Sequence, residues 1–74
     1  MKNNNHKFSV GDVVVRIAYK DSKSAMMRDE CTINEIVSDG HPIVPRMWYV
    51  CTNFRGQRCN GLVSVMDDCF MLKV

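Results

Sequence analysis

Short runs in which hydrophobic and polar residues alternate make up most of the chain. Alternation with a period of two is typical of β-strands, because successive side chains point to opposite faces of a sheet. The runs are separated by clusters of Gly, Asp, Asn and Pro, which favour turns. The pattern predicts five or six short strands, which start near Phe8 and continue at 13–19, 31–37, 47–54, 62–66 and 69–73.

The connections between these runs have the residues that tight turns require. Turns are expected at Gly11-Asp12, at 38–40, at 55–58 and at Asp67-Asp68, while Asn60-Gly61 is expected to supply a positive φ for a bulge or a further turn. Pro42 and Pro45 exclude regular structure between the second and third long runs. No segment predicts an amphipathic helix, so the expected class is all-β, as a small curled sheet or barrel.

The alternation also predicts which side chains fill the interior. Ile33 and Ile36 are separated by an odd number of residues, so both face inward only if a bulge lies near Glu35; otherwise one of them is excluded. Trp48 is expected to be partly covered. The residues expected to point inward are Phe8, Val10, Val13, Val15, Ile17, Ile33, Ile36, Val50, Leu62, Phe70 and Leu72.

Length and composition indicate one small soluble domain. The chain has 74 residues, of which 46% are hydrophobic and 24% charged, and these values are ordinary for a globular protein. A net charge of +2 is too small to predict an extended nucleic-acid-binding surface. The expected organisation is a disordered N-terminus at 1–6, followed by a single domain at 7–74. The longest apolar run, 47–51, is too short for a membrane span or a secretory signal. A cytoplasmic protein without a membrane partner is therefore expected.

The four cysteines lie at positions 31, 51, 59 and 69, and no two of them form a C-x-x-C pair. Without a secretory signal they are expected to be reduced, although two disulfides in three possible pairings remain open. A zinc-stabilised module is a further alternative, because cysteine thiolates are zinc ligands. The spacing does not favour it, and neither a metal nor a cofactor is expected.

The segment from Lys7 to Val14 contains the phrase Phe-Ser-Val-Gly-Asp-Val-Val, which is similar to the opening of many small SH3-like barrels. Together with Met27, the run 31–36, the run 48–54 and the closing run 69–72, it resembles the YodC-like family of uncharacterised bacterial and phage proteins. The resemblance covers most of residues 7–74. It implies an SH3-like barrel of five to six antiparallel strands and says almost nothing about activity, since such barrels serve many functions.

Candidate catalytic groups are few, so no enzyme is expected. Asp67-Asp68 is a pair of carboxylates that could act in acid–base chemistry or hold a divalent ion, but a turn between strands is the simpler interpretation. His41 precedes Pro42 in an expected loop, where a structural role is more common than catalysis. The sequence also lacks a nucleophile motif and a phosphate-binding glycine loop.

Two features favour binding functions. Residues 20–30 have six charges around an apolar centre at Met26-Met27, which predicts a long loop that either binds a protein or folds back to plug an open end of the barrel. Arginines interleave with aromatic residues between positions 46 and 58, and this is typical of phosphate and base recognition. Because Trp48 and Tyr49 lie on opposite faces of a strand, one aromatic face in the core is the simpler interpretation.

These features lead to one principal hypothesis and one alternative. The principal hypothesis is a non-enzymatic phage or prophage accessory protein that binds and modulates a host protein through Met26, Met27, Arg28, Trp48, Arg55 and Arg58. The alternative is a nucleic-acid-binding barrel that uses Arg46, Trp48, Arg55 and Arg58. The sequence does not identify the partner or the oligomeric state.

Overall fold

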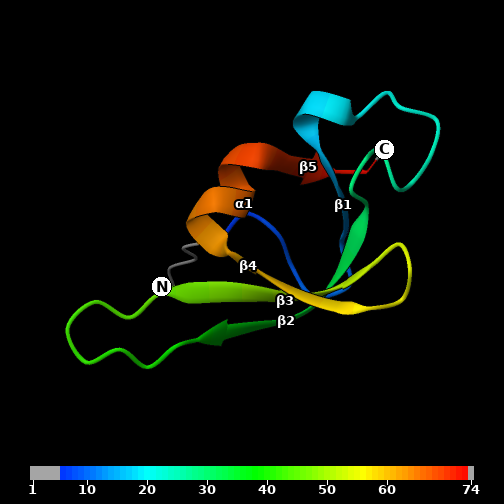
Figure 1. Ribbon diagram of the computed structural model, residues 1–74. Coiled ribbons are helices and arrows are strands. Elements are labelled where there is room, and N and C mark those ends of the chain that lie inside the picture. The colour runs from blue at the N-terminus through cyan, green and yellow to red at the C-terminus, as the bar shows by residue number, and fades with distance from the viewer. Residues whose placement is uncertain (1–5, 74) are drawn as a thin grey trace.

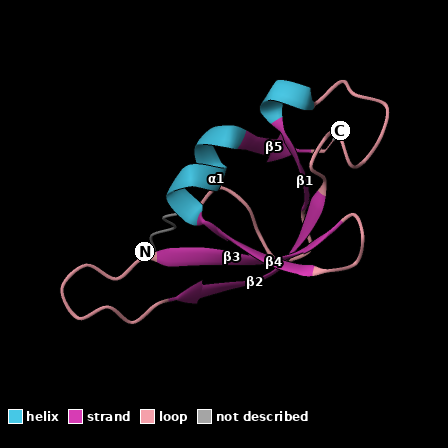
Figure 2. Cartoon of the chain, viewed as in Figure 1, coloured by secondary structure: helices cyan, strands magenta, loops and turns pink. Residues whose placement is uncertain are grey.

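A bent, five-stranded antiparallel sheet forms the framework of the protein (Figure 1). The computed structural model describes residues 6–73, so the expectation of disorder at 1–6 concerns residues that lie almost entirely outside the described part. The strand order is β4-β3-β2-β1-β5. The elements are β1 (Val13–Arg16), a 3-10 helix (Ile17–Tyr19), β2 (Cys31–Ser38), β3 (Met47–Asn53), β4 (Arg58–Leu62), α1 (Val63–Cys69) and β5 (Phe70–Leu72) (Figure 2).

The β2–β3 hairpin is the longest ladder of the sheet and agrees with the predicted runs. Its register extends from the Cys31/Asn53 pair to the Ser38/Met47 pair and shifts between Ile33 and Glu35. This bulge turns both isoleucines toward the interior: Ile33 is buried and Ile36 packs against the core. Of the two alternatives left by the sequence, the structure has the bulge near Glu35 and not the exclusion of one isoleucine.

The first long run is a strand over only half of its predicted length. After Arg16 the chain forms the 3-10 helix, where the Lys20 amide donates to the carbonyl of Ile17 at 3.3 Å. Ile17 and Tyr19 leave the sheet and are 40% and 50% exposed. The prediction that Ile17 faces the interior is wrong, because the strand alternation ends before this residue is reached.

Residues 62–66, predicted as a strand, instead end β4 and begin α1. Val63, Met66 and Phe70 are all buried, and their spacing of three and four residues is that of one helical face. Asn60-Gly61 forms no positive-φ turn, because Gly61 belongs to β4 and the described glycines with positive φ are Gly11, Gly40 and Gly56. The prediction for this stretch is wrong, because the period of two stops at Leu62.

The core lies between the concave face of the sheet and α1. Its buried members are Phe8, Val14, Cys31, Ile33, Tyr49, Cys51, Val63, Met66 and Phe70. Val15 and Val50 are also buried but are not members of this cluster, and Val13 and Leu62 are only half-buried. The prediction that Val10 and Leu72 face the interior is wrong: they are 61% and 50% exposed, because Val10 precedes β1 and Leu72 is the last residue of β5, an edge strand of the sheet.

The small, mostly antiparallel β-domain predicted from the sequence is confirmed. Among the described residues no ladder joins β4 to β5, so the sheet stays open and α1 passes between these two edge strands instead. No helix among residues 6–73 is long and apolar enough to cross a membrane.

Candidate functional site

The loop at 20–30 and the turn at 53–58 lie at the same end of the sheet, on the right of Figure 1. The pairing of Cys31 with Asn53 brings the end of the loop beside the start of the turn. The Arg16 amide donates to the carbonyl of Arg28 at 2.8 Å and holds the loop against β1. The tertiary structure thus places the two segments singled out in the sequence at one end of the molecule.

A single helical turn gives the 20–30 loop a defined shape. The Arg28 amide donates to the carbonyl of Ser24 at 3.1 Å, and the Ser24 hydroxyl accepts from the Met27 amide at 3.0 Å. Ser favours such a position because its side-chain oxygen accepts from an otherwise unpaired amide. A further bond runs from the Glu30 amide to the carbonyl of Ala25 at 3.1 Å.

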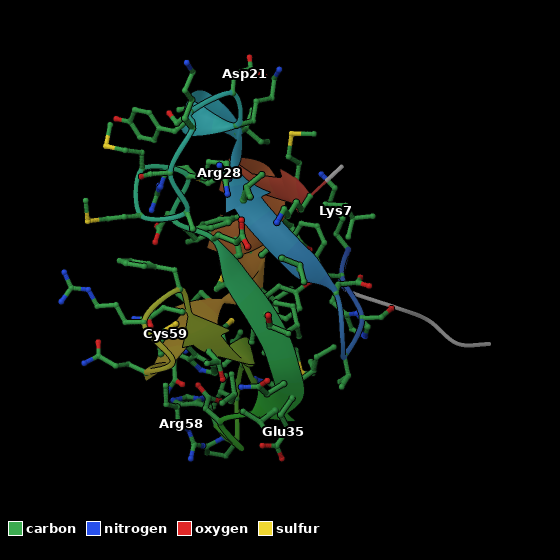
Figure 3. The ribbon with its side chains drawn as sticks, turned by 90° about the vertical axis from the view of Figure 1, so that its right-hand side faces the viewer. Lys7, Asp21, Arg28, Glu35, Arg58 and Cys59 are labelled. Carbon is green, nitrogen blue, oxygen red and sulfur yellow. The ribbon has the colours of Figure 1, made fainter. Side chains whose placement is uncertain are left out.

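Arg28 holds this loop together from within (Figure 3). Its guanidinium donates to the carbonyl of Ser22 at 2.8 Å and to Oε1 of Glu30 at 2.9 Å, and Lys73 donates to the other oxygen of Glu30 at 3.2 Å. The hydrogen bond from Arg28 is the main cause that lowers the pKa of Glu30. The charge of Arg28 is therefore paired within the chain and is not offered to a partner, and its side chain is only 18% exposed.

Met26 and Met27 are carried by this loop but take little part in the packing. They are 55% and 54% exposed, and neither belongs to the hydrophobic core. The interpretation that they plug an open end of the barrel is therefore wrong. They present flexible, polarizable apolar surface to the solvent.

The 53–58 turn is shaped by the side chain of Asn53. Its Oδ1 accepts the amides of Arg55 and Gln57, both at 2.9 Å, and Gly56 takes the positive φ of 80° that a side chain would disfavour. Phe54 is 40% exposed, and the Arg55 guanidinium lies over its ring, 5.4 Å from the centroid. The predicted turn at 55–58 is thus present.

The charges of Arg55 and Arg58 are exposed to solvent and can pair with a binding partner. Both are exposed, and neither forms an ion pair within the part of the chain that the structure describes. Arg58 starts β4 opposite Thr52 and lies at the margin of the turn. We define the loop-end surface as Met26, Met27, Phe54, Arg55 and Arg58.

Trp48 and Arg46 lie at the other end of β3, away from the loop-end surface. Trp48 pairs with Val37 and Leu62, so it is four residues from the Thr52/Arg58 pair, roughly 13 Å along a strand. It is half-buried, with the Arg46 guanidinium 5.7 Å from its ring centroid. The residues expected to form one site are therefore divided between two ends of the sheet.

The charge of Arg46 is compensated by Asp39 within the β2–β3 loop. Its Nε donates to Asp39 Oδ2 at 2.9 Å, and its amide donates to Asp39 Oδ1 at 3.0 Å. Backbone hydrogen bonds from Arg46 and His41, followed by the side-chain bond from Arg46, lower the pKa of Asp39 to about 2. The His41 ring accepts the amides of Ile43 and Val44 at 3.2 Å, so these groups shape a loop.

The Asp67-Asp68 pair lies in α1 and not in a turn between strands. Asp67 Oδ1 accepts the Tyr49 hydroxyl at 2.7 Å, and Oδ2 accepts the Lys7 amide at 3.1 Å. Asp67 therefore ties α1 to β3 and to the N-terminal segment. This role was missed because nothing in the sequence pairs Tyr49 with a carboxylate 18 positions away.

The arrangement of the thiols does not follow from their spacing in the sequence. All four cysteines are free, and three of them, Cys31, Cys51 and Cys59, line one hollow beside α1. Within residues 6–73 no group of three His, Cys, Asp or Glu side chains is arranged to hold a metal ion. Comparisons of the chain with models of protein families, with curated protein sequences and with solved structures find no match.

Proposed function

We propose that the protein is a non-enzymatic binding module whose loop-end surface contacts an acidic patch on a partner protein. The observation that carries the proposal is the combination, at one end of the sheet, of two half-exposed methionines with two arginines that lack an ion pair among the described residues. Met provides adaptable apolar contact, while Arg pairs with carboxylates through two parallel hydrogen bonds. Arg28 and Asn53 hold the two segments in shape, which lowers the entropy lost on binding.

We also propose that the fold is an SH3-like barrel that α1 closes in place of a fifth ladder. The strand order, in which β5 returns beside β1 while β2, β3 and β4 follow in sequence, supports this assignment. So does the position of α1 between the two edge strands. The resemblance to YodC-like proteins is the reason to propose an accessory protein of a phage or prophage, with the partner in the cytoplasm of its host.

The methionines set the scale of the expected affinity effect. Full burial of a Met side chain is worth about 1.5–3 kcal/mol, and each of these is already about half covered. Covering both therefore contributes about 2–3 kcal/mol, or roughly a 30- to 150-fold change in Kd. An interface of this kind depends on few residues, so single substitutions test it.

The test is capture of the partner from a host lysate by the tagged protein, followed by mass spectrometry. Met27→Asp and Arg55→Glu are each expected to reduce recovery of the same partner at least tenfold. The matched control is Ile43→Asp, which alters an 81% exposed apolar residue in the β2–β3 loop and is expected to leave recovery unchanged. Equal recovery by the wild type and both loop-end variants would refute the proposal.

A nucleic-acid partner is the competing outcome of this experiment. A mobility-shift titration at two salt concentrations separates the two, because phosphate contacts release counterions and weaken steeply with salt. The division of Arg46 and Trp48 from Arg55 and Arg58 disfavours a single stacking platform. Salt-sensitive binding that disappears in the double variant Arg55→Ala with Arg58→Ala would replace the protein-binding proposal.

A further inference from the structure

Three thiols converge on the concave face of the sheet, each from a different strand. Cys51 of β3 lies directly opposite Cys59 of β4, and Cys31 of β2 pairs with Asn53, two positions from Cys51 on the same face. All three line a hollow of about 280 Å³ whose wall is completed by Met66 and Phe70, among others. Cys59, labelled in Figure 3, is the half-buried member, whereas Cys31 and Cys51 are buried.

The register allows only one of these pairs to be bridged without moving the backbone. Residues directly opposite each other in an antiparallel pair have Cα atoms about 4.5–5.5 Å apart, which is within the span of a disulfide. Diagonal neighbours such as Cys31 and Cys51 are separated by about 7–8 Å, which is beyond that span. Cys69 ends α1 and does not line the hollow.

The thiols also interact electrostatically. Hydrogen bonding from the Cys31 thiol, supported by Cys59, lowers the pKa of Cys51. Burial is the main cause that raises the pKa of Cys59, and hydrogen bonding to Cys51 is the main cause that raises that of Cys31. Cys51 is therefore the thiol that most readily supplies a thiolate, and Cys59 is the sulfur that small molecules reach most easily.

From this geometry we propose that Cys51 and Cys59 are an oxidation site that forms a reversible intramolecular disulfide on reaction with hydrogen peroxide. In the first step Cys59 loses its proton and its thiolate attacks the peroxide; the O–O bond breaks, sulfenic acid forms, and the hydroxide that leaves takes up the proton from Cys59 as water. In the second step the Cys51 thiolate attacks that sulfur, the S–S bond forms and the S–O bond breaks, and the sulfenic hydroxyl takes up the proton that Cys51 has lost and leaves as a second water. Each sulfur gives up one electron, and the peroxide takes up two. The bond closes a ring around the whole 53–58 turn.

Peptide mapping of the reduced, purified chain after treatment with hydrogen peroxide tests the proposal. Trypsin alone leaves Cys59 and Cys69 on one peptide, so a second protease that cleaves before Asp67 or Asp68 is needed to separate them. The expected product is a monomer lighter by two hydrogens in which Cys51 is linked to Cys59. Cys31 and Cys69 are expected to be alkylated after unfolding, and dithiothreitol is expected to restore the starting mass.

Two half-buried cysteines provide matched variants. Cys59→Ser is expected to abolish the intramolecular link, whereas Cys69→Ser is expected to react as the wild type does; a circular dichroism spectrum of each establishes that it folds. Cys59→Ala replaces Cys59→Ser if the hydroxyl disturbs folding. A disulfide between any other pair, a disulfide-linked dimer, added oxygen on Cys59 without a link, or no reaction at peroxide concentrations that oxidise free glutathione would each overturn the proposal.

Discussion

Replacing Tyr49 with Phe removes one hydroxyl that holds three parts of the molecule together. The hydroxyl accepts the amides of Lys7 and Phe8, both at 3.0 Å, and donates to Asp67 at 2.7 Å. It thereby links the N-terminal segment to β3 and α1. Tyr49 is fully buried, and its ring packs against Phe8 with the centroids 5.7 Å apart, so the substitution leaves the apolar packing in place.

The cost comes mainly from the amide of Phe8, which is left in the interior without an acceptor. An unsatisfied buried donor costs about 1–3 kcal/mol. Lys7 retains its bond to the other oxygen of Asp67, and the half-buried carboxylate can be rehydrated, so these groups add little. The free energy of unfolding is therefore expected to fall by about 2 kcal/mol, roughly a 30-fold change in the folding equilibrium.

Urea denaturation followed by circular dichroism measures this change. With a slope of about 1 kcal/mol per molar urea, the midpoint is expected to fall by about 2 M. Tyr19→Phe is the matched control, because Tyr19 is 50% exposed and its hydroxyl has no hydrogen bond within residues 6–73. A Tyr49→Phe protein that unfolds within about 0.5 kcal/mol of the control would refute the argument, since surface changes stay within that range.

Two further predictions concern high pH and the packing of α1. Burial raises the pKa of Tyr49 to about 12 from the ordinary value of 10.0. The native state therefore binds more protons than the unfolded state between these values, and the stability advantage over Tyr49→Phe is expected to shrink as pH rises from 10 to 12. An unchanged advantage in denaturation curves would contradict this. At Gly61 an added Cβ would lie 2.8 Å from Cγ of buried Met66. Gly61→Ala is therefore expected to cost about 1 kcal/mol and to lower Tm by about 4–8 °C in calorimetry, and an unchanged Tm would contradict it.

The segments whose residues most strongly favour a strand are also those where the predicted and observed strands agree best. The run at 47–54 is aromatic and β-branched without Gly or Pro, and all of it except Phe54 forms β3, which lies between β2 and β4 in the sheet. The odd spacing of Ile33 and Ile36 left two alternatives, a bulge or the exclusion of one isoleucine, and the structure has the bulge, because an extra residue allows both to reach one interior. Local pattern is sufficient where a strand is long and its two faces differ.

The predictions of secondary structure were wrong in short segments whose hydrophobic pattern fits both the period of a strand and the period of a helix. The spacing of Val63, Met66 and Phe70 fits one face of a helix, but the pattern of residues 62–66 also fits a strand. A helix of seven residues is too short for its hydrophobic pattern to distinguish it from a strand. The chain adopts the helix because it has to pass from β4 across the core to β5, beside β1. That requirement is set by tertiary packing and not by residues 62–66 themselves.

The candidate site was predicted in part. The sequence identified the 20–30 loop and the 55–58 turn, and the exposure of Met26 and Met27 agrees with a surface role. The sequence did not reveal that the Arg28 guanidinium donates its hydrogen bonds to Ser22 and Glu30, because these contacts depend on how the loop folds back on itself.

Alternation, turn residues and apolar content were enough to determine a small antiparallel β-domain with one long hairpin, because these preferences act between neighbouring residues. Only the tertiary structure decided that Trp48 stands apart from Arg55, that three cysteines from separate strands share one hollow, and that Tyr49 binds Asp67. Each of these arrangements depends on strand register and on the path of α1. Register is a property of two segments together, and it is fixed only when their buried faces pack against the same core.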